Sequence, residues 1–340
     1  MEKIRTATIA LLLLLTLVGS LPAVSTVRAY DYGFGHSSDL YSTQWWMRYQ
    51  DLIQIYYAFP QIQNLFAERY YWIWTPYGWW PYRQVYGHVE DFQAQTSYSL
   101  VTTQIRHCEQ NHDSAAVFYY GHMGMRGVQG LSFPDWSYGF REQAQPNDPP
   151  ETVDVIWDTD IYNAWNINKH HFVFLWVCHN GNNQGAQYPL PPHGMPFCWT
   201  RRSLSTNGYG APDGSGYCFM SFQNASACLS EWMGTYGQQG TENIYKFWLI
   251  YFYYFALGDP LDLYYPQQQL SIKDSLDEAS IRVGYDGWQD PNNRLSNIYD
   301  WWEYYWPGWP GYPEPPADDY WGKLRIYGDG HMFLPGDAEW

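Results

Sequence analysis

The sequence HHFVFLWVCHNG, residues 170–181, combines an unbroken apolar run with an abrupt polar ending. The run stops at Cys178, which is followed directly by a histidine, an asparagine and a glycine. A second run, AAVFYY at residues 115–120, stops in the same way at Gly121 and His122. Continuous apolar runs of this length are typical of strands that are buried on both faces, as in parallel sheets.

A predicted helix precedes the first of these strands, because apolar residues recur at three- and four-residue steps over residues 96–110. Helix and strand together predict an α/β fold with a mostly parallel central sheet. Ligands bind at the carboxyl ends of the strands in such sheets, so we expect His122 and Cys178 to meet at one edge. Further predicted elements are a helix at residues 45–59, a β-prone stretch at 70–82, a strand at 217–222 and helices at 226–233, 243–257 and 271–283.

The first 29 residues have the pattern of a secretory signal peptide. A basic start is followed by an apolar run at residues 9–18 and by a small-residue exit that ends at Ala29. The run is short for a membrane span, which needs about 20 residues. We therefore expect cleavage near Ala29 and a secreted product, with an uncleaved anchor as the alternative.

The composition excludes some partners. The formal net charge is −16, so the chain would repel nucleic acids and anionic membranes. We expect no nucleic-acid partner and, after signal cleavage, no membrane partner, whereas association with the cell envelope stays open. Aromatic residues make up 20% of the chain. Their rings provide apolar surface that can be buried in a core, and Tyr and Trp also carry a polar group.

The chain has five cysteines, and an odd number in an exported protein leaves a thiol that is reactive or otherwise outside a disulfide. Cys198, Cys218 and Cys228 lie in a region rich in glycine, proline and serine, where a disulfide could join loops. Cys108 continues the apolar stripe of the helix at 96–110 and is expected in the core. The sequence leaves the pairing among these four cysteines open.

Cys178 and His122 are residue types that catalyse acyl transfer together, because an imidazole can take the proton of a thiol and later return it to a leaving group. Cys178 would attack a peptide carbonyl, His122 would protonate the leaving amine, and water would complete the cycle. The backbone N–H groups of Gly124 and Cys178 are the expected oxyanion donors. This chemistry requires no cofactor.

The segments VFYYGHMG (117–124) and VFLWVCHNG (173–181) resemble the caspase-like clan of cysteine peptidases, which includes caspases, legumain, clostripain and the gingipains. The Cys-His-Asn-Gly turn is most similar to the gingipain version. The resemblance covers about residues 95–285 and implies a three-layer α/β sandwich with a His–Cys dyad at the carboxyl edge. It implies a secreted endopeptidase acting on proteins or peptides, with a catalytic domain at 30–290 and an aromatic, proline-rich extension at 291–340.

Three positions depart from the family pattern. Met123 replaces the usual glycine after the histidine, and Val177 replaces a small residue before the cysteine. Trp176 stands where several members have an acidic residue that binds a basic substrate side chain, so specificity for arginine or lysine is not carried over. The candidate substrate-binding residues are Asp154, Asp158, Asp160 and Trp176. A calcium ion would suit such a relative, but no residue pattern indicates a calcium site.

Simpler interpretations exist for several of these residues. A cysteine at the end of a strand can be only a small buried hydrophobic residue, and structural roles are expected for His170, His171 and His179. A zinc site built from Cys178, His179, His193 and Cys198 lacks the short paired spacings of such sites. The Asn224-Ala225-Ser226 segment matches a glycosylation sequon, or Ser226 caps a helix.

Two other functional classes stay open. The first is a secreted cell-envelope or carbohydrate-binding protein, on a caspase-like scaffold that has lost its activity. The aromatic segment at 301–320 supports it, because flat sugar faces stack on aromatic rings, although such a segment can equally cover the core. The second is a glycosidase, but no pair of acidic residues is marked out by its position at strand ends.

Overall fold

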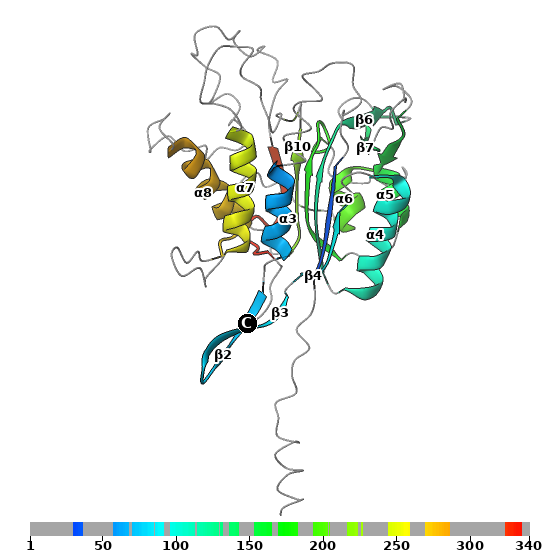
Figure 1. Cartoon of the computed structure of the whole chain (residues 1–340). Coiled ribbons are helices and arrows are strands. Elements are labelled where there is room, and N and C mark those ends of the chain that lie inside the picture. The colour runs from blue at the N-terminus through cyan, green and yellow to red at the C-terminus, as the bar shows by residue number, and fades with distance from the viewer. Residues whose placement is uncertain are drawn as a thin grey trace, which may run out of the picture.

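The computed structural model describes residues 30–36, 57–67, 70–84, 86–91, 96–112, 114–128, 130–131, 136–142, 153–164, 169–182, 193–202, 204, 216–223, 226, 244–258, 269–285 and 324–334. Within these residues a central β-sheet lies between two layers of helices, as Figure 1 shows with the sheet seen nearly edge-on. The fold class is mixed α/β with a mostly parallel sheet, as predicted.

The central sheet has six strands in the order β11-β10-β9-β5-β1-β4. The strands are β1 (Tyr30–His36), β4 (Tyr86–Asp91), β5 (Ala115–Tyr120), β9 (His170–Trp176), β10 (Cys218–Phe222) and β11 (Leu324–Gly328). All neighbours are parallel except β10 and β11. Five strands therefore end at one side of the sheet, here called the carboxyl edge, and begin at the opposite side, the amino edge.

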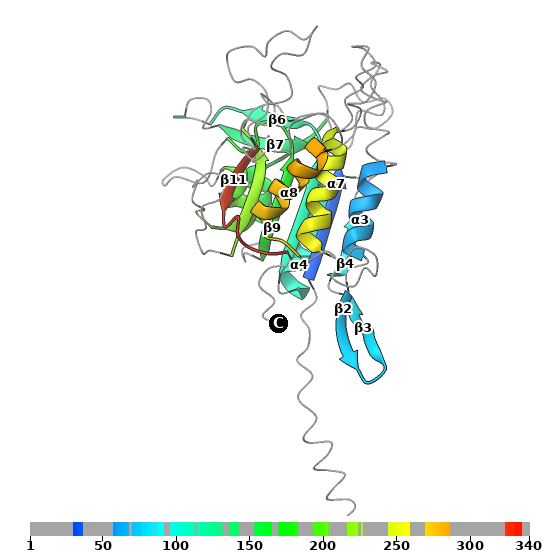
Figure 2. The same ribbon diagram turned by 90° about the vertical axis from the view of Figure 1, so that its left-hand side faces the viewer.

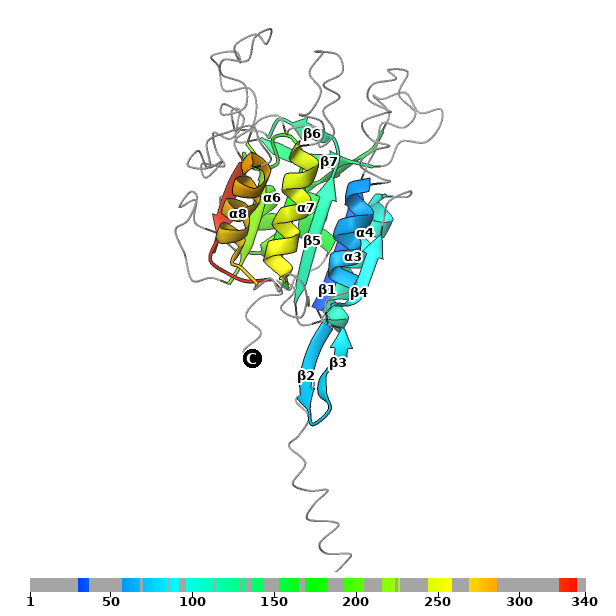
Figure 3. The ribbon, with the colours of Figure 1, turned by 60° about the vertical axis from the view of Figure 1, so that its left-hand side comes forward.

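Two helical layers cover the sheet, and Figure 3 shows one of them in front of β5. The first layer contains α3 (Phe59–Ala67), α7 (Ile244–Leu257) and α8 (Ile272–Tyr285). The second contains α4 (Tyr98–Asn111), α5 (Asp158–Ala164) and α6 (Met195–Thr200). The helix predicted at residues 45–59 differs from α3, which begins at Phe59, and residues 45–56 lie outside the described part.

Alternation along each strand divides the core between the two layers. Phe118 and Phe174 face the layer of α3, α7 and α8, whereas Val117 and Val173 face the layer of α4, α5 and α6. Aromatic rings fill the first interface, where the Phe118 ring lies edge-on to Phe174 with centroids 5.6 Å apart. Each fully buried side chain of this size stabilises the fold by roughly 1.5–3 kcal/mol, which accounts for part of the aromatic content.

A small antiparallel sheet follows β5 at the carboxyl edge. It consists of β6 (Met123–Arg126), β7 (Ser137–Arg141) and β8 (Val155–Trp157). Figure 3 shows the arrow of β5 pointing towards β6 and β7. None of these three strands was predicted, because they have only three to five residues each and no long apolar run.

The stretch at residues 70–82 is β-structure, as predicted, and it forms a hairpin. It consists of β2 (Tyr70–Thr75) and β3 (Gly78–Gln84), paired antiparallel around Pro76 and Tyr77. Figures 1 and 2 show the hairpin projecting from the amino edge, at the opposite end of the molecule from β6 and β7.

Other predicted elements are also present. The helices expected at 96–110 and 243–257 and the strand expected at 217–222 correspond to α4, α7 and β10. The helix expected at 271–283 is α8, and Ser271 caps it by accepting a hydrogen bond of 3.1 Å from the Asp274 backbone N–H. Residues 1–29, 227–233 and 301–320 lie outside the described part, and so do the predictions made for them.

The segment 291–340, expected to be an extension, contributes to the α/β unit. Its strand β11 is the edge strand of the central sheet, and Met332 and Leu334 pack in the same core as α8. Residues 324–334 therefore belong to the domain. Among the described residues, no helix has both the length and the apolar character needed to cross a membrane.

Candidate active site

His122 and Cys178 lie at equivalent positions beyond two adjacent strands. Strands β5 and β9 are parallel neighbours in which Tyr120 pairs with Trp176, and each of the two residues follows its strand by two positions. Neighbouring strands are about 4.8 Å apart. The backbone N–H of Gly121 bonds to the Trp176 carbonyl at 3.3 Å, which holds the two strand ends together. Both backbone positions therefore lie at the carboxyl edge of neighbouring parallel strands.

Cys178 is partly buried, and its side chain is a thiol that is not in a disulfide. It begins a tight turn in which His179 has a φ of 59°, in the left-handed region that few non-glycine residues adopt. Nδ1 of the His179 ring lies 3.1 Å from both the Gln223 carbonyl oxygen and Nδ2 of Asn182. Burial lowers the pKa of His179, so the ring is held in its neutral form.

The next two residues attach the turn to its surroundings. Asn180 is buried and donates hydrogen bonds from Nδ2 to the carbonyls of Gly139, at 3.1 Å, and Cys178, at 2.9 Å. Gly181 approaches β10 so closely that a Cβ atom there would lie 2.5 Å from the Ser221 carbonyl oxygen. The polar residues of the Cys-His-Asn-Gly turn are thus used to position the cysteine, whose own side chain remains accessible.

Ser226 contacts the sulfur atom of Cys178. Its backbone nitrogen lies 3.2 Å from Sγ, and its hydroxyl oxygen lies 3.3 Å from the same atom. Hydrogen-bond donors at this distance stabilise negative charge on sulfur. From the sequence, Ser226 was expected only as part of a sequon or as a helix cap. Its position four residues after the end of β10, the other neighbour of β9, is the signal that points to the site.

His122 is held between β5 and the small sheet. Its carbonyl accepts a hydrogen bond of 2.9 Å from the Arg141 backbone N–H. The Arg141 carbonyl in turn accepts a hydrogen bond of 2.7 Å from the hydroxyl of Tyr119, in β5. The His122 side chain is partly buried. These two hydrogen bonds attach His122 to β7 and β7 to β5, so the backbone of His122 has little freedom to move.

The structure gives Gly124 a packing role. It pairs with Gly139 in the ladder of β6 and β7, and a Cβ atom at Gly124 would lie 2.4 Å from Cγ1 of Val155. Hydrogen-bonded pairs alternate along an antiparallel ladder. Since Arg141 bonds to His122, the pair of Gly124 and Gly139 occupies the next such position, and the Gly124 N–H is directed to β7. This geometry does not favour the oxyanion role predicted for Gly124.

The three candidate aspartates have different environments. Asp158 is buried and accepts backbone hydrogen bonds from Thr159 and Gly194, each at 2.8 Å, and a side-chain bond from Ser137. Burial raises its pKa, and these hydrogen bonds oppose the shift. Asp160 accepts a bond of 2.9 Å from the Trp157 N–H. Asp154 is exposed, so of the three it is the one whose carboxylate faces solvent.

Trp176 is a core residue. Its exposed fraction is 0%, and its ring packs edge-on against Phe222 and Trp248 at centroid distances of 5.0 and 5.9 Å. A ligand could not reach this ring without separating α7 from the sheet. The candidate substrate-binding role of Trp176 is therefore not supported. The physical reason is the alternation of β9, which directs residues 172, 174 and 176 towards the same helical layer.

Two of the cysteines that could have formed a disulfide lie on opposite faces of the sheet. Cys218 faces the layer of α3, α7 and α8, whereas Cys198 faces the opposite layer, and both are buried thiols. A disulfide between these two is therefore not formed, and Cys228 lies outside the described part. Cys108 is buried on α4, as predicted. Within the described part of the chain, no three His, Cys, Asp or Glu side chains gather as a potential metal site.

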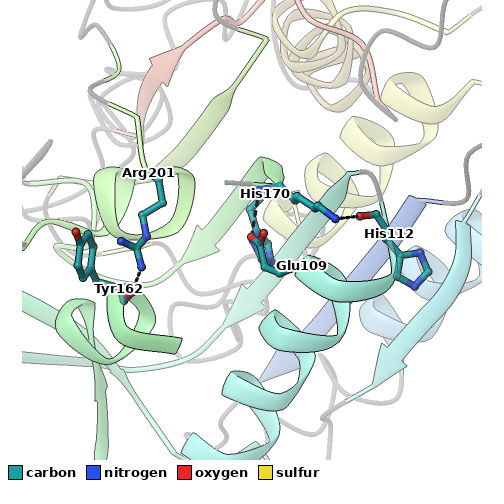
Figure 4. Close-up of polar contacts among 6 residues, drawn as sticks. Glu109, His112, Tyr162, His170 and Arg201 are labelled. Atoms are coloured by element: carbon teal, nitrogen blue, oxygen red, sulfur yellow. Dashed lines mark hydrogen bonds and ion pairs between the residues drawn. The ribbon is translucent and has the colours of Figure 1, made fainter. Parts of the chain in front are cut away.

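The histidines at the start of β9 lie at the amino edge, away from Cys178. His170 is buried, and its Nδ1 is 3.5 Å from Oε1 of Glu109 on α4. Figure 4 shows this pair, a hydrogen bond to the His112 carbonyl and the contact of Arg201 with Tyr162. The donor to the His112 carbonyl is Nζ of Lys169. His171 stacks on Tyr217 with ring centroids 4.4 Å apart. These contacts support the structural roles expected for both histidines.

Neither a protein-family model nor a curated protein matches the chain.

Proposed function

We propose that the chain is a cysteine endopeptidase with a caspase-like fold, in which Cys178 is the nucleophile and His122 is the general acid and base. One observation carries the proposal: the two residues occupy equivalent positions, two residues beyond the last register pair of adjacent parallel strands. In α/β sheets, this edge is where ligands bind. The thiol state of Cys178 and its partial exposure are compatible with the role.

The arrangement of the domain supports the caspase-like assignment. A sheet with five parallel strands and one antiparallel edge strand lies between two helical layers, which agrees with the α/β sandwich implied by the resemblance. The histidine motif ends one central strand and the cysteine motif ends its neighbour. These two motifs are the ones on which the resemblance was based.

The proposed reaction has two steps. In the first, His122 takes the thiol proton of Cys178, Sγ attacks the carbonyl carbon of the scissile peptide bond, and His122 passes that proton to the amine nitrogen as the C–N bond breaks. In the second, His122 takes a proton from water, whose oxygen attacks the thioester carbonyl and releases the free thiol. Atoms and charges balance without a cofactor, and any bound calcium would act on the structure rather than in these steps.

The oxyanion of each tetrahedral intermediate needs N–H donors near the sulfur. The backbone N–H of Cys178 remains one candidate. Met123 replaces Gly124 as the other, because the alternation of the β6–β7 ladder directs the Met123 N–H away from β7. A side chain at this position does not remove the donor. The departure of Met123 from the family pattern is thus compatible with catalysis.

Ser226 completes the proposed site. Its N–H and hydroxyl, at 3.2 and 3.3 Å from Sγ, would stabilise the thiolate before attack. The proposed substrate is an extended segment of a protein or peptide outside the cell. Asp154 is the aspartate that remains available for contact with a basic group of the substrate.

The test is peptide hydrolysis by the purified protein, measured on a fluorogenic peptide library. We expect Cys178→Ala to lower kcat/KM by at least about 10³-fold and His122→Ala by roughly 10²–10⁴-fold. The matched controls are Cys198→Ala and His171→Ala, which change the same residue types away from the site. Hydrolysis that survives Cys178→Ala would overturn the proposal and favour the inactive scaffold of a secreted binding protein.

A further inference from the structure

The β2–β3 hairpin exposes large aromatic side chains. The exposed fractions are 67% for Trp74, 91% for Tyr77 and 57% for Trp80. An isolated two-stranded hairpin is marginally stable in water, and placing large aromatic rings in solvent adds nothing to its stability. These rings are therefore available to a partner.

The aromatic residues occupy both faces of the hairpin as well as its tip. Trp74 pairs with Trp79, and Ile73 pairs with Trp80. Because successive residues of a strand point to opposite faces, Trp74 and Trp80 lie on opposite faces, while Tyr77 is at the turn. A sugar or a flat protein surface would cover one of these faces. Insertion into the interfacial layer of a bilayer would cover both faces and the tip together.

Most of the hairpin is uncharged, and its one charged residue, Arg83, lies near its base. No Lys, Arg, Asp or Glu occurs between Arg69 and Arg83, although eight of these thirteen residues are aromatic. At the turn, the hydroxyl of Thr75 donates to the Gly78 carbonyl at 2.8 Å and accepts from the Tyr77 N–H at 3.3 Å. Polar backbone groups that are bonded internally cost less to remove from water. Trp and Tyr are the residues that favour the bilayer interface.

The position of the hairpin agrees with a membrane on that side. The hairpin projects from the amino edge of the sheet (Figures 1 and 2), and β1 begins at Tyr30 on the same edge. Cys178 lies at the opposite edge, so a surface bound by the hairpin would leave that edge open to solvent.

We propose that residues 74–80 dock the protein onto a lipid bilayer with uncharged, zwitterionic headgroups. The hairpin lies in the interface and does not span the bilayer, and its aromatic rings penetrate about 5–10 Å. The net charge of −16 still opposes anionic membranes, since the acidic groups lie elsewhere in the chain. The proposal therefore departs from the expectation of no membrane partner, which was drawn from charge alone, and it does not depend on peptidase activity.

The test is flotation of the protein with phosphatidylcholine vesicles. The chain from Tyr30 onward retains every described element and lacks the apolar run, so binding would report on the folded domain. We expect Trp74→Ala and Trp80→Ala each to weaken binding by roughly tenfold or more. Tyr77→Lys, which places a charge at the tip, is expected to abolish flotation. The control is Tyr98→Ala, which removes another exposed aromatic ring, of 45% exposure, at the start of α4 and towards the carboxyl edge.

Three results would overturn the proposal. The first is no flotation of the unaltered domain with phosphatidylcholine. The second is equal loss of flotation in the Tyr98→Ala control, which would indicate unspecific adsorption. The third is tight binding to soluble polysaccharide that Trp74→Ala abolishes while flotation is unchanged, which would assign the hairpin to a carbohydrate. Circular dichroism and thermal unfolding of each variant would show that the fold is retained.

Discussion

The backbone nitrogen of Ser226 lies 3.2 Å from the sulfur atom of Cys178. This contact joins β10 to β9 at the carboxyl edge, and His122 follows β5 on the other side of β9. Three neighbouring strands thus each supply one residue to the same edge. The proposed division of roles follows from this order, with the sulfur in the middle, the imidazole on one side and hydrogen-bond donors on the other.

Ser226→Ala removes the hydroxyl contact and keeps the backbone N–H. We expect kcat/KM to fall by roughly threefold to tenfold, because one hydrogen bond contributes about 1 kcal/mol. The measurement is hydrolysis of a fluorogenic peptide in a host that does not glycosylate. Asn224→Gln is the matched control, since it removes the same sequon and keeps Ser226. Equal losses in both variants would contradict a role for the hydroxyl.

His179 makes the stability depend on pH. Its pKa is lowered by burial, so the unfolded chain binds the proton more readily than the folded chain. The contribution of neutral His179 is therefore present above the unfolded pKa of about 6.5 and is lost as the pH falls through the folded value. We expect Tm to decrease between pH 7.5 and pH 5, and to decrease less in His179→Asn, because asparagine tolerates positive φ. The same pH slope in both proteins would refute this explanation.

Gly124→Ala should destabilise the fold by about 1–3 kcal/mol, because the added methyl group would overlap with Val155. Chemical denaturation measures the loss. Val155→Ala alone creates a small cavity, but combined with Gly124→Ala it should recover part of the stability. Additive losses in the double variant would show that this overlap is not the reason for the glycine.

Asp158→Ala should cost about 1–3 kcal/mol of stability, because the buried N–H of Gly194 would lose its acceptor. The matched control is Asp154→Ala, which removes an exposed carboxylate of the same connection and should leave Tm unchanged. Thermal unfolding of the two variants separates the structural aspartate from the exposed one. Similar Tm values for both variants would argue against the structural role of Asp158.

The parts of the fold that the sequence predicted are those with a strong local pattern. Strands β5 and β9 are unbroken apolar runs, and α7 has fourteen residues with one charged side chain, Lys246. By contrast, β1 has the sequence YDYGFGH, whose polar and glycine residues conceal a strand in the middle of the sheet. The pairing of β11 with β10 spans about a hundred residues of sequence and has no local signal.

The candidate site likewise contains residues with a local sequence signal and residues without one. The positions of His122 and Cys178 followed from two strand ends, whereas Ser226 required knowledge that β10 lies beside β9. The misassignment of Trp176 came from relying on the family pattern instead of the two-residue alternation of β9, which directs this ring into the core. The role expected for Gly124 changed because β7 and β8 were not visible in the sequence.

The most direct test of the central claim is to follow alkylation of Cys178 by iodoacetamide with peptide mass spectrometry while measuring peptide hydrolysis in the same samples. Activity should fall in proportion to the fraction of Cys178 that is modified, with the buried thiols of Cys198 and Cys218 unmodified. Hydrolysis that persists after complete modification of Cys178 would contradict the account.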